Sequence, residues 1–343
     1  MKKYRVGIIG CGNIFPMHAV SLKNLKETEL VAVCDIKEER AKEKANEFSC
    51  DYYQDYQEMI ARGGLDVVHI CTPHYLHALM TICAAEAGLH VLTEKPMSIS
   101  KDEARKMIAT CDENKVTLGV IFQNRYNPGS QLIKKTLTSG KLGKIYGVKM
   151  AVTWKRTDEY YSKSDWKGTW DKEGGGVVID QAIHTMDLMR WFINSDIEYV
   201  EANIANRGHL LIDVEDLAEG VIKFKNNILG SFYTINYYSH DAPVSIEIHC
   251  ERGLASITGD TGIIKFKNGR EILAQRDPRE SFDYGNSKSY WGVSHIKQIT
   301  NYYESLSKGI APEITGREAY KTQEMVGAIY QSGKTGERVI FAD

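Results

Sequence analysis

An apolar run that enters two glycines constrains this chain more than any other feature. Residues 5–9 form the run, and Gly10 and Gly12 follow it in the spacing Gly-x-Gly. A helical pattern leads to a second apolar run at 30–34, which ends at Asp35. Strand, tight turn, helix and strand in this order build a parallel α/β sheet.

The same residues predict what the turn holds. Gly10 can adopt the angles of a tight turn, and Gly12 lacks a Cβ, so a pyrophosphate can approach the helix N-terminus at Asn13 and Ile14. Asp35 can accept hydrogen bonds from adenosine ribose hydroxyls and would repel a 2′-phosphate. We therefore expect NAD as cofactor, with NADP disfavoured. The alternative is an ordinary βα turn of an unrelated α/β protein.

Length and composition narrow the class of protein. The 343 residues exceed what one core usually serves, so two domains are expected. A net charge of −2 gives no reason to expect a nucleic-acid or membrane partner. The seven cysteines are scattered without a Cys-x-x-Cys pair, which predicts reduced thiols in a cytoplasmic protein and no structural zinc.

The pattern of elements changes near residue 122. Strand and helix patterns alternate over 1–122, which predicts an α/β Rossmann domain with a doubly wound parallel sheet. Residues 123–343 are expected to form an α+β domain with a large, mostly antiparallel open sheet. Its predicted strands are 145–154, 198–207, 217–225, 228–238, 244–250, 254–258 and 263–267. An open sheet that its helices cannot cover on both faces suggests a homo-oligomer interface.

Two strand ends of the first domain carry polar side chains. Glu94 and Lys95 end one predicted strand, and Thr72, Pro73 and His74 end another. Ligands bind at this edge of parallel sheets, so we expect these residues near the nicotinamide and its ribose. Lys95 is a candidate for proton transfer, and Pro96 a candidate for a cis peptide bond. A surface lysine in a loop is the alternative.

A triple glycine in the second domain precedes a carboxylate and an imidazole. Asp180 and His184 are four residues apart, so they share a helix face, and a carboxylate can orient an imidazole as a general base. A helix cap for Asp180 and a buried core role for His184 are the alternatives. An Asp/His metal site lacks a third ligand, so no metal is expected.

Other polar and aromatic residues are candidate substrate contacts. Arg125 and Tyr126 suit a polyhydroxyl or phosphorylated ligand. Tyr160, Trp166 and Trp170 precede the glycines, and their rings either stack on a sugar or pack against the sheet. Gln181 follows Asp180 directly and joins the candidates.

Taken together and in order, these motifs resemble the family of glucose–fructose oxidoreductase, inositol 2-dehydrogenase and MocA over essentially the whole chain. The residues on which this resemblance rests are Gly10–Gly12, Asp35, Thr72–His74 with His77, Glu94–Pro96, the triple glycine and Asp180–Asp187. The resemblance implies oxidation of a secondary alcohol of a sugar, sugar derivative or cyclitol, with hydride passing to a nicotinamide. It places Lys95 near the reacting carbon and makes Asp180 and His184 the acid–base pair.

The resemblance leaves several readings open. The Trp166–Trp170 stretch looks like a subgroup that oxidises nucleotide-linked sugars or glycosides, although Asp180 stands where that subgroup often has asparagine. Some relatives hold NAD tightly and process glycosides without net redox change. A non-catalytic nucleotide or sugar sensor is a further alternative. A small-molecule sugar-type substrate and a homodimer or homotetramer are the expected partners.

Overall fold

The computed structural model describes residues 3–277, 279, 280 and 292–342. It divides into two compact units. The first contains residues 1–123 and 278–320, and the second contains residues 124–277 and 321–343.

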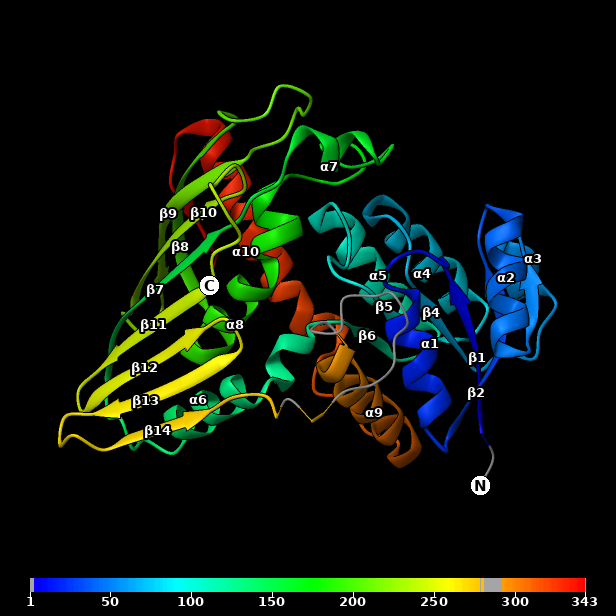
Figure 1. The fold of residues 1–343 in the computed structure, drawn as a ribbon, viewed down its shortest axis with the longest axis horizontal. Coiled ribbons are helices and arrows are strands. Elements are labelled where there is room, and N and C mark those ends of the chain that lie inside the picture. The colour runs from blue at the N-terminus through cyan, green and yellow to red at the C-terminus, as the bar shows by residue number, and fades with distance from the viewer. Residues whose placement is uncertain (1–2, 278, 281–291, 343) are drawn as a thin grey trace. The chain divides into compact units, whose positions relative to one another are not determined.

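A six-stranded parallel sheet forms the centre of the first unit (Figure 1). Its order, β3-β2-β1-β4-β5-β6, is that of dinucleotide-binding sheets, and it reverses between β1 and β4. Both of these strands have buried segments, as expected where helices cover the two faces. The expected Rossmann domain is therefore confirmed. The strands are β1 (Tyr4–Ile9), β2 (Thr28–Cys34), β3 (Asp51–Tyr53), β4 (Val67–Ile70), β5 (His90–Thr93) and β6 (Leu118–Val120).

Local sequence sets where the crossover helices begin. Asp55 caps α3 by accepting a hydrogen bond from the Gln57 amide at 2.8 Å. Ser100 caps α5 in the same way, with the Glu103 amide 3.1 Å from its hydroxyl oxygen. The helices are α1 (Phe15–Asn24), α2 (Glu38–Phe48), α3 (Tyr56–Ala61), α4 (His77–Glu86) and α5 (Lys101–Glu113).

A late helix, α9 (Gly292–Lys308), also belongs to the first unit. It packs against α1, and the Gln298 amide accepts from the Phe122 N–H at 2.9 Å and donates to the Val120 carbonyl at 2.7 Å. The sequence analysis divided the chain once, at residue 122, and so placed α9 in the second domain. That assignment is corrected here: an amphipathic pattern predicts a helix but does not identify the surface that the helix covers.

Replacing Gln298 tests this attachment. We expect Gln298→Ala to lower the free energy of unfolding by about 2 kcal/mol, because two buried backbone groups lose their partners. Glu304→Ala on the exposed side of α9 is the matched control and should have almost no effect. Urea unfolding followed by circular dichroism measures both, and equal effects would contradict the assignment.

A nine-stranded sheet dominates the second unit, in the order β14-β13-β12-β11-β7-β10-β9-β8-β15. Only the pair β10 and β7 is parallel among the described pairings of this sheet, so the expected mostly antiparallel sheet is confirmed. The strands are β7 (Ile145–Thr153), β8 (Ile197–Ala205), β9 (Leu217–Phe224), β10 (Leu229–Ile235), β11 (Ser245–Cys250), β12 (Gly253–Thr258), β13 (Thr261–Phe266), β14 (Glu271–Ala274) and β15 (Val339–Ile340).

Helices pack against one face of this sheet. α6 packs on β12, β13 and β14, α8 packs on β7 and β11, and Gly333 of α10 meets Ile204 of β8. On the opposite face of β10, Leu229 and Tyr233 remain 46% and 38% exposed. The helices are α6 (Pro128–Thr138), α7 (Asp158–Ser162), α8 (Ile183–Ile193) and α10 (Gly316–Thr335), of which α10 crosses the division at residue 320.

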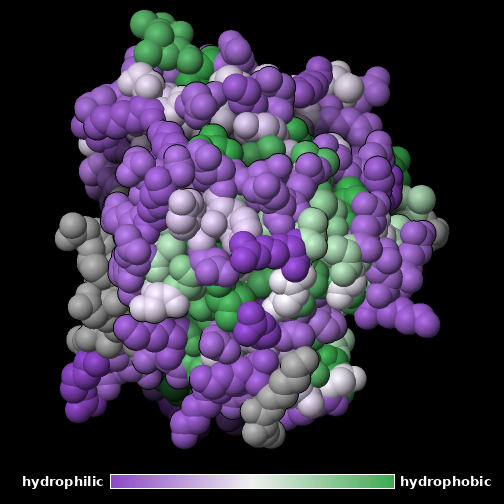
Figure 2. Space-filling view, turned by 90° about the vertical axis from the view of Figure 1, so that its right-hand side faces the viewer, coloured by the Kyte–Doolittle hydropathy of each residue, from purple (hydrophilic) through white to green (hydrophobic). Residues whose placement is uncertain are grey.

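The face that Figure 2 shows is mostly hydrophilic, and its hydrophilic residues surround a smaller apolar area. Among the described residues, no helix combines the length and the apolar character needed to cross a lipid bilayer.

Candidate active site

The turn after β1 contains two glycines, and the structure explains each of them differently. Gly10 has φ +97°, and a Cβ there would overlap the Cys71 carbonyl, so the fold itself requires glycine. A Cβ at Gly12 would meet no protein atom within 4 Å. No side chain caps α1, whose N-cap residue is Ile14. Gly12 therefore faces open space beside a helix N-terminus, which fits the expected pyrophosphate.

The carboxylate of Asp35 stands beside this turn. Its Oδ2 accepts from the Cys11 amide at 3.0 Å and from Arg40 Nη1 at 3.2 Å, and its Oδ1 accepts from the Lys37 amide at 2.9 Å. Asp35 thus holds the glycine turn against the end of β2, and its contact with an adenosine ribose stays a prediction.

Gly12 offers a clean test of coenzyme binding. We expect Gly12→Ala to leave thermal stability unchanged and to weaken NAD binding by at least about tenfold, because the methyl group occupies the space for the pyrophosphate. Calorimetric titration with NAD measures the affinity. Gly10→Ala is the contrasting variant, since it should lower stability itself. Unchanged NAD affinity in Gly12→Ala would contradict this placement.

A buried histidine joins the two polar strand ends of the first unit. One His77 ring nitrogen lies 2.7 Å from the Pro96 carbonyl oxygen, and the other lies 2.8 Å from that of Thr72. The Lys95–Pro96 peptide bond is cis, as predicted. Thr72, Pro73 and the Glu94–Pro96 turn are therefore brought together at the sheet edge after β4 and β5, where the sequence analysis placed them; His74 begins the short 3-10 helix that follows.

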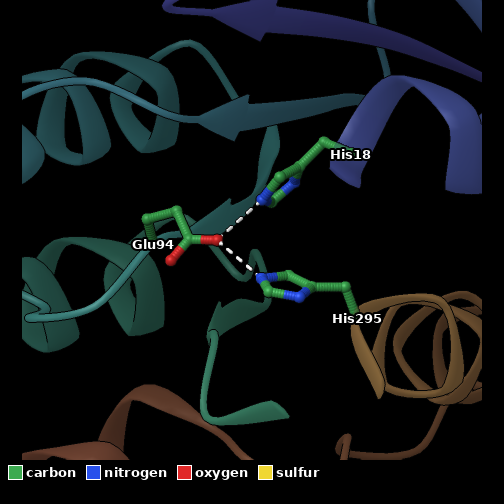
Figure 3. Close-up of side chains that lie close together, drawn as sticks. All are labelled: His18, Glu94 and His295. Atoms are coloured by element: carbon green, nitrogen blue, oxygen red, sulfur yellow. Dashed lines mark hydrogen bonds and ion pairs between the residues drawn. The ribbon is translucent and has the colours of Figure 1, made fainter. Parts of the chain in front are cut away.

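Glu94 is anchored in a cluster of histidines (Figure 3). Its Oε1 lies 2.9 Å from His18 Nε2 and 3.3 Å from His295 Nε2, while its Oε2 accepts from the Lys95 amide at 3.2 Å. Burial acts to raise the pKa of Glu94, but the hydrogen bonds from the two histidines hold it well below its ordinary value. The ionised carboxylate therefore fixes the backbone that presents Lys95.

The three ligand-type atoms of this cluster lie within 4.8 Å of one another, a spacing that also suits a metal ion. Hydrogen bonding accounts for the same geometry. His18 Nδ1 is 2.9 Å from His69 Nδ1, and His69 Nε2 is 2.8 Å from the Tyr303 hydroxyl. With both imidazoles neutral, as burial favours by lowering the pKa of each, one chain of donors runs from Tyr303 to Glu94. We interpret the cluster as hydrogen-bonded.

In the second unit, two residues of the triple glycine lie too close to neighbouring groups to carry a side chain. A Cβ on Gly175 would overlap the Tyr330 hydroxyl, and a Cβ on Gly176 would overlap the Glu215 carbonyl. The glycines let the backbone approach both groups closely, and a π-helical turn, Val177–Ala182, follows and leads into α8.

Side chains remote in sequence cap this helical segment. Glu215 accepts from the Gly176 amide at 2.8 Å and from the Val178 amide at 3.0 Å. Tyr330 accepts from the Ile179 amide at 3.1 Å and donates to Glu215 at 2.9 Å. Burial raises the pKa of Glu215 to about 7, although the amides of Val178 and Gly176 lower it. The N-terminal amides thus have partners, and the segment that carries Asp180 is held in place.

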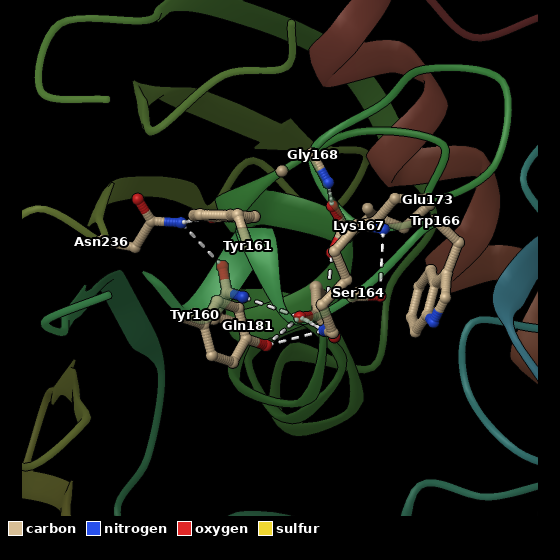
Figure 4. A network of polar contacts seen from close by, with 12 residues as sticks. Tyr160, Tyr161, Ser164, Trp166, Lys167, Gly168, Glu173, Gln181 and Asn236 are labelled. Atoms are coloured by element: carbon tan, nitrogen blue, oxygen red, sulfur yellow. Dashed lines mark hydrogen bonds and ion pairs between the residues drawn. The ribbon is translucent and has the colours of Figure 1, made fainter. Parts of the chain in front are cut away.

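Asp180 contacts three residues of a polar network, Tyr160, Lys167 and Gln181, which Figure 4 labels. Its Oδ2 accepts from Lys167 Nζ at 2.6 Å, from Gln181 Nε2 at 2.7 Å and from the Tyr160 hydroxyl at 3.1 Å. The structure therefore brings three predicted site residues, Tyr160, Asp180 and Gln181, together. His184 follows on α8, at the start of the same continuous helical segment.

Sequence reasoning missed one member of this network, Lys167. The signal was present, since Lys167 lies between Trp166 and Trp170, which were both singled out. Its ammonium also lies 4.7 Å from the centre of the Trp166 ring. Lys167 supplies a positive charge to the network of Asp180, and it connects the aromatic stretch to the helical segment that carries Asp180.

Arg125, predicted to contact substrate, is instead a structural residue. Its guanidinium donates to both carboxylate oxygens of Asp187, at 2.7 and 2.6 Å, and the side chains of both are 1% exposed. Thr322 donates to the same carboxylate at 2.7 Å. The prediction is corrected because a guanidinium engaged in a buried bidentate pair is not available to a ligand. Tyr126, half-buried beside it, stays a prediction.

Trp170 is held by the protein itself. Its indole donates to the Asp213 carbonyl at 2.8 Å, its ring meets Tyr330 edge to face at 5.1 Å, and Lys334 Nζ lies 3.6 Å from its centre. Packing within the unit therefore explains Trp170 without a sugar, and Trp166 is the better candidate of the two for stacking.

Two family models match successive parts of the chain. Residues 4–122 match the model of an oxidoreductase family with an NAD-binding Rossmann fold, and residues 130–256 match the Gfo/Idh/MocA C-terminal domain. The myo-inositol 2-dehydrogenase of Thermotoga maritima is 25% identical over 92% of this chain and 91% of its own length.

Two solved structures of WlbA dehydrogenases, each in complex with NADH and UDP-GlcNAcA, are also similar. The one from Bordetella pertussis has a TM-score of 0.86 and 29% identity, and it covers 100% of both chains. The one from Chromobacterium violaceum has a TM-score of 0.86 and 30% identity over 100% of this chain and 97% of its own.

Proposed function

This chain belongs to the Gfo/Idh/MocA family of NAD-dependent oxidoreductases, and from that premise we propose that it oxidises a secondary hydroxyl of a sugar, glycoside, nucleotide sugar or cyclitol. The observation that carries the proposal is the network of Asp180, which lies four residues before His184 in a helical segment that glycines and Glu215 hold in place. A sensor has no need of an acid–base pair, so this network favours an enzyme.

In this proposal, separate residues bind the cofactor and transfer the proton. Gly12 and the N-terminus of α1 hold the pyrophosphate, and Asp35 accepts from the ribose. The chemistry that NAD would supply when bound is acceptance of a hydride from the carbon that bears the hydroxyl. His184 accepts the hydroxyl proton as the carbonyl forms, and Lys95 donates a hydrogen bond to the oxygen.

Variants of the two proton-transfer residues test these roles. We expect Lys95→Met and His184→Asn each to lower kcat by at least about 100-fold while NAD still binds, because each removes a group that acts in the transition state. Steady-state kinetics at saturating NAD, with calorimetric titration as the binding control, distinguishes the two effects. Turnover within a few-fold of wild type in either variant would contradict the assignment.

A substrate panel tests the reaction itself. Absorbance of reduced nicotinamide is followed with NAD, then NADP, against inositols, free sugars, simple glycosides and nucleotide sugars, with UDP-GlcNAcA among the first. A rise with NAD and one class of compound supports the proposal. If no compound gives a rise, denaturation and assay of released NAD follows. Trapped NAD would then favour a redox-neutral glycoside-processing enzyme.

The exposed face of the large sheet supports a homodimer or homotetramer. Leu229 and Tyr233 point from β10 to the side opposite the helices, beside Lys149 of β7. A sheet covered on one face only leaves apolar area that a second copy can bury. We expect light scattering to report a dimer or larger species, and Tyr233→Glu to reduce its mass. A monomer at all concentrations would contradict this.

A further inference from the structure

We propose that Lys167 is a positioning residue whose ammonium holds Asp180 as an oriented anion, so that Asp180 acts as a fixed charge and His184 carries the proton. The inference deepens the proposed function and rests on it for the assignment of the proton to His184. Its structural basis lies entirely within the second unit.

Three oxygen atoms of this unit surround the ammonium of Lys167. Nζ lies 2.6 Å from Asp180 Oδ2, 2.7 Å from the Tyr160 hydroxyl and 3.6 Å from Glu173 Oε1. Its side chain is 17% exposed, and that of Asp180 is 11% exposed. The first two contacts are hydrogen bonds, and the third is an ion pair without a hydrogen bond. Lys167 is therefore built to hold Asp180 rather than to bind a ligand.

Electrostatics pairs the positive charge of Lys167 with Asp180. Burial acts to lower the pKa of Lys167, but Asp180, Tyr160 and Glu173 raise it above its ordinary value, so Lys167 stays an ammonium. Burial, and then the charge of Asp180, raise the pKa of Glu173, so this carboxyl competes weakly for Lys167. Burial also raises the pKa of Tyr160 to about 12, which keeps its hydroxyl as a donor. Arg156 stacks on the Tyr160 ring.

The network also fixes the direction of the carboxylate. Gln181 donates to Asp180 Oδ2, and Asn236 holds Gln181 by donating to its Oε1 at 3.0 Å. The same Asn236 amide donates to the Tyr161 hydroxyl at 2.7 Å. The three donors on Oδ2 therefore restrict the rotation of the Asp180 carboxylate. Loss of Lys167 would remove a positive charge from beside this carboxylate, and a carboxylate that loses a neighbouring cation takes up a proton more readily.

Four proteins test the proposal: wild type, Lys167→Met, Lys167→Arg and the control Lys163→Met. Lys163 lies in the same loop but pairs with exposed Glu159, so its loss should change nothing. We expect Lys167→Met to lower kcat by about 100-fold with little change in KM, because a misdirected catalytic group impairs the chemical step. The acid limb of the pH–rate profile should move to higher pH, since removal of a cation raises the pKa of the neighbouring ionisable groups, the imidazole of the proposed base included. Lys167→Arg should restore both.

A second readout needs no substrate. In protein labelled with ¹³C at the aspartate carboxyl carbon, the Asp180 signal is assigned with Asp180→Asn and titrated by NMR. We expect its midpoint to move to higher pH in Lys167→Met and to return in Lys167→Arg, with thermal stability as the folding control.

The outcomes separate the two proposals. Unchanged kcat, pH limb and Asp180 midpoint in folded Lys167→Met would overturn the role of Lys167, and so would an arginine variant as impaired as the methionine variant. A shifted midpoint in a protein that oxidises nothing on the panel would support the positioning role and count against the proposed function.

Discussion

The segment that carries Asp180 depends on the Glu215 carboxylate. Its two oxygens accept hydrogen bonds from the Gly176 and Val178 amides. A helix that begins in a buried place must satisfy its first N–H groups, and no local side chain caps this one. Glu215 and Tyr330 supply the partners from distant parts of the chain. The glycines follow from this arrangement, because any side chain at Gly175 or Gly176 would collide with the capping groups.

In the first unit, another buried carboxylate holds the backbone that carries a candidate site residue. Glu94 accepts from His18 and His295 through one oxygen and from the Lys95 amide through the other. Both candidate proton-transfer residues are therefore presented by backbone that an anchored carboxylate holds. A carboxylate suits this task because it accepts several hydrogen bonds, and its buried charge is costly unless those donors are kept in place.

Patterns within one element were predictable, and partners across the chain were not. The strands near the glycine turn follow from apolar runs, since a parallel strand buried on both faces has almost no polar positions. The short edge strands β14 and β15 carry no such run and were missed. The pairing of Arg125 with Asp187 spans 62 positions, so sequence alone offered the guanidinium as a ligand contact. Lys167 was missed for the same reason, because its partner lies on another element.

The network of Asp180 bears on which group in a carboxylate–imidazole dyad moves the proton. An efficient general base has a pKa near the working pH, and an imidazole meets that condition without adjustment. A carboxylate that accepts from an ammonium, an amide and a phenol is stabilised as an anion and is a poor proton acceptor. Its value lies in a constant negative charge that favours positive charge developing on a neighbour. The donors on Asp180 Oδ2 therefore favour the proposed division of roles, in which Asp180 stays an anion and His184 transfers the proton.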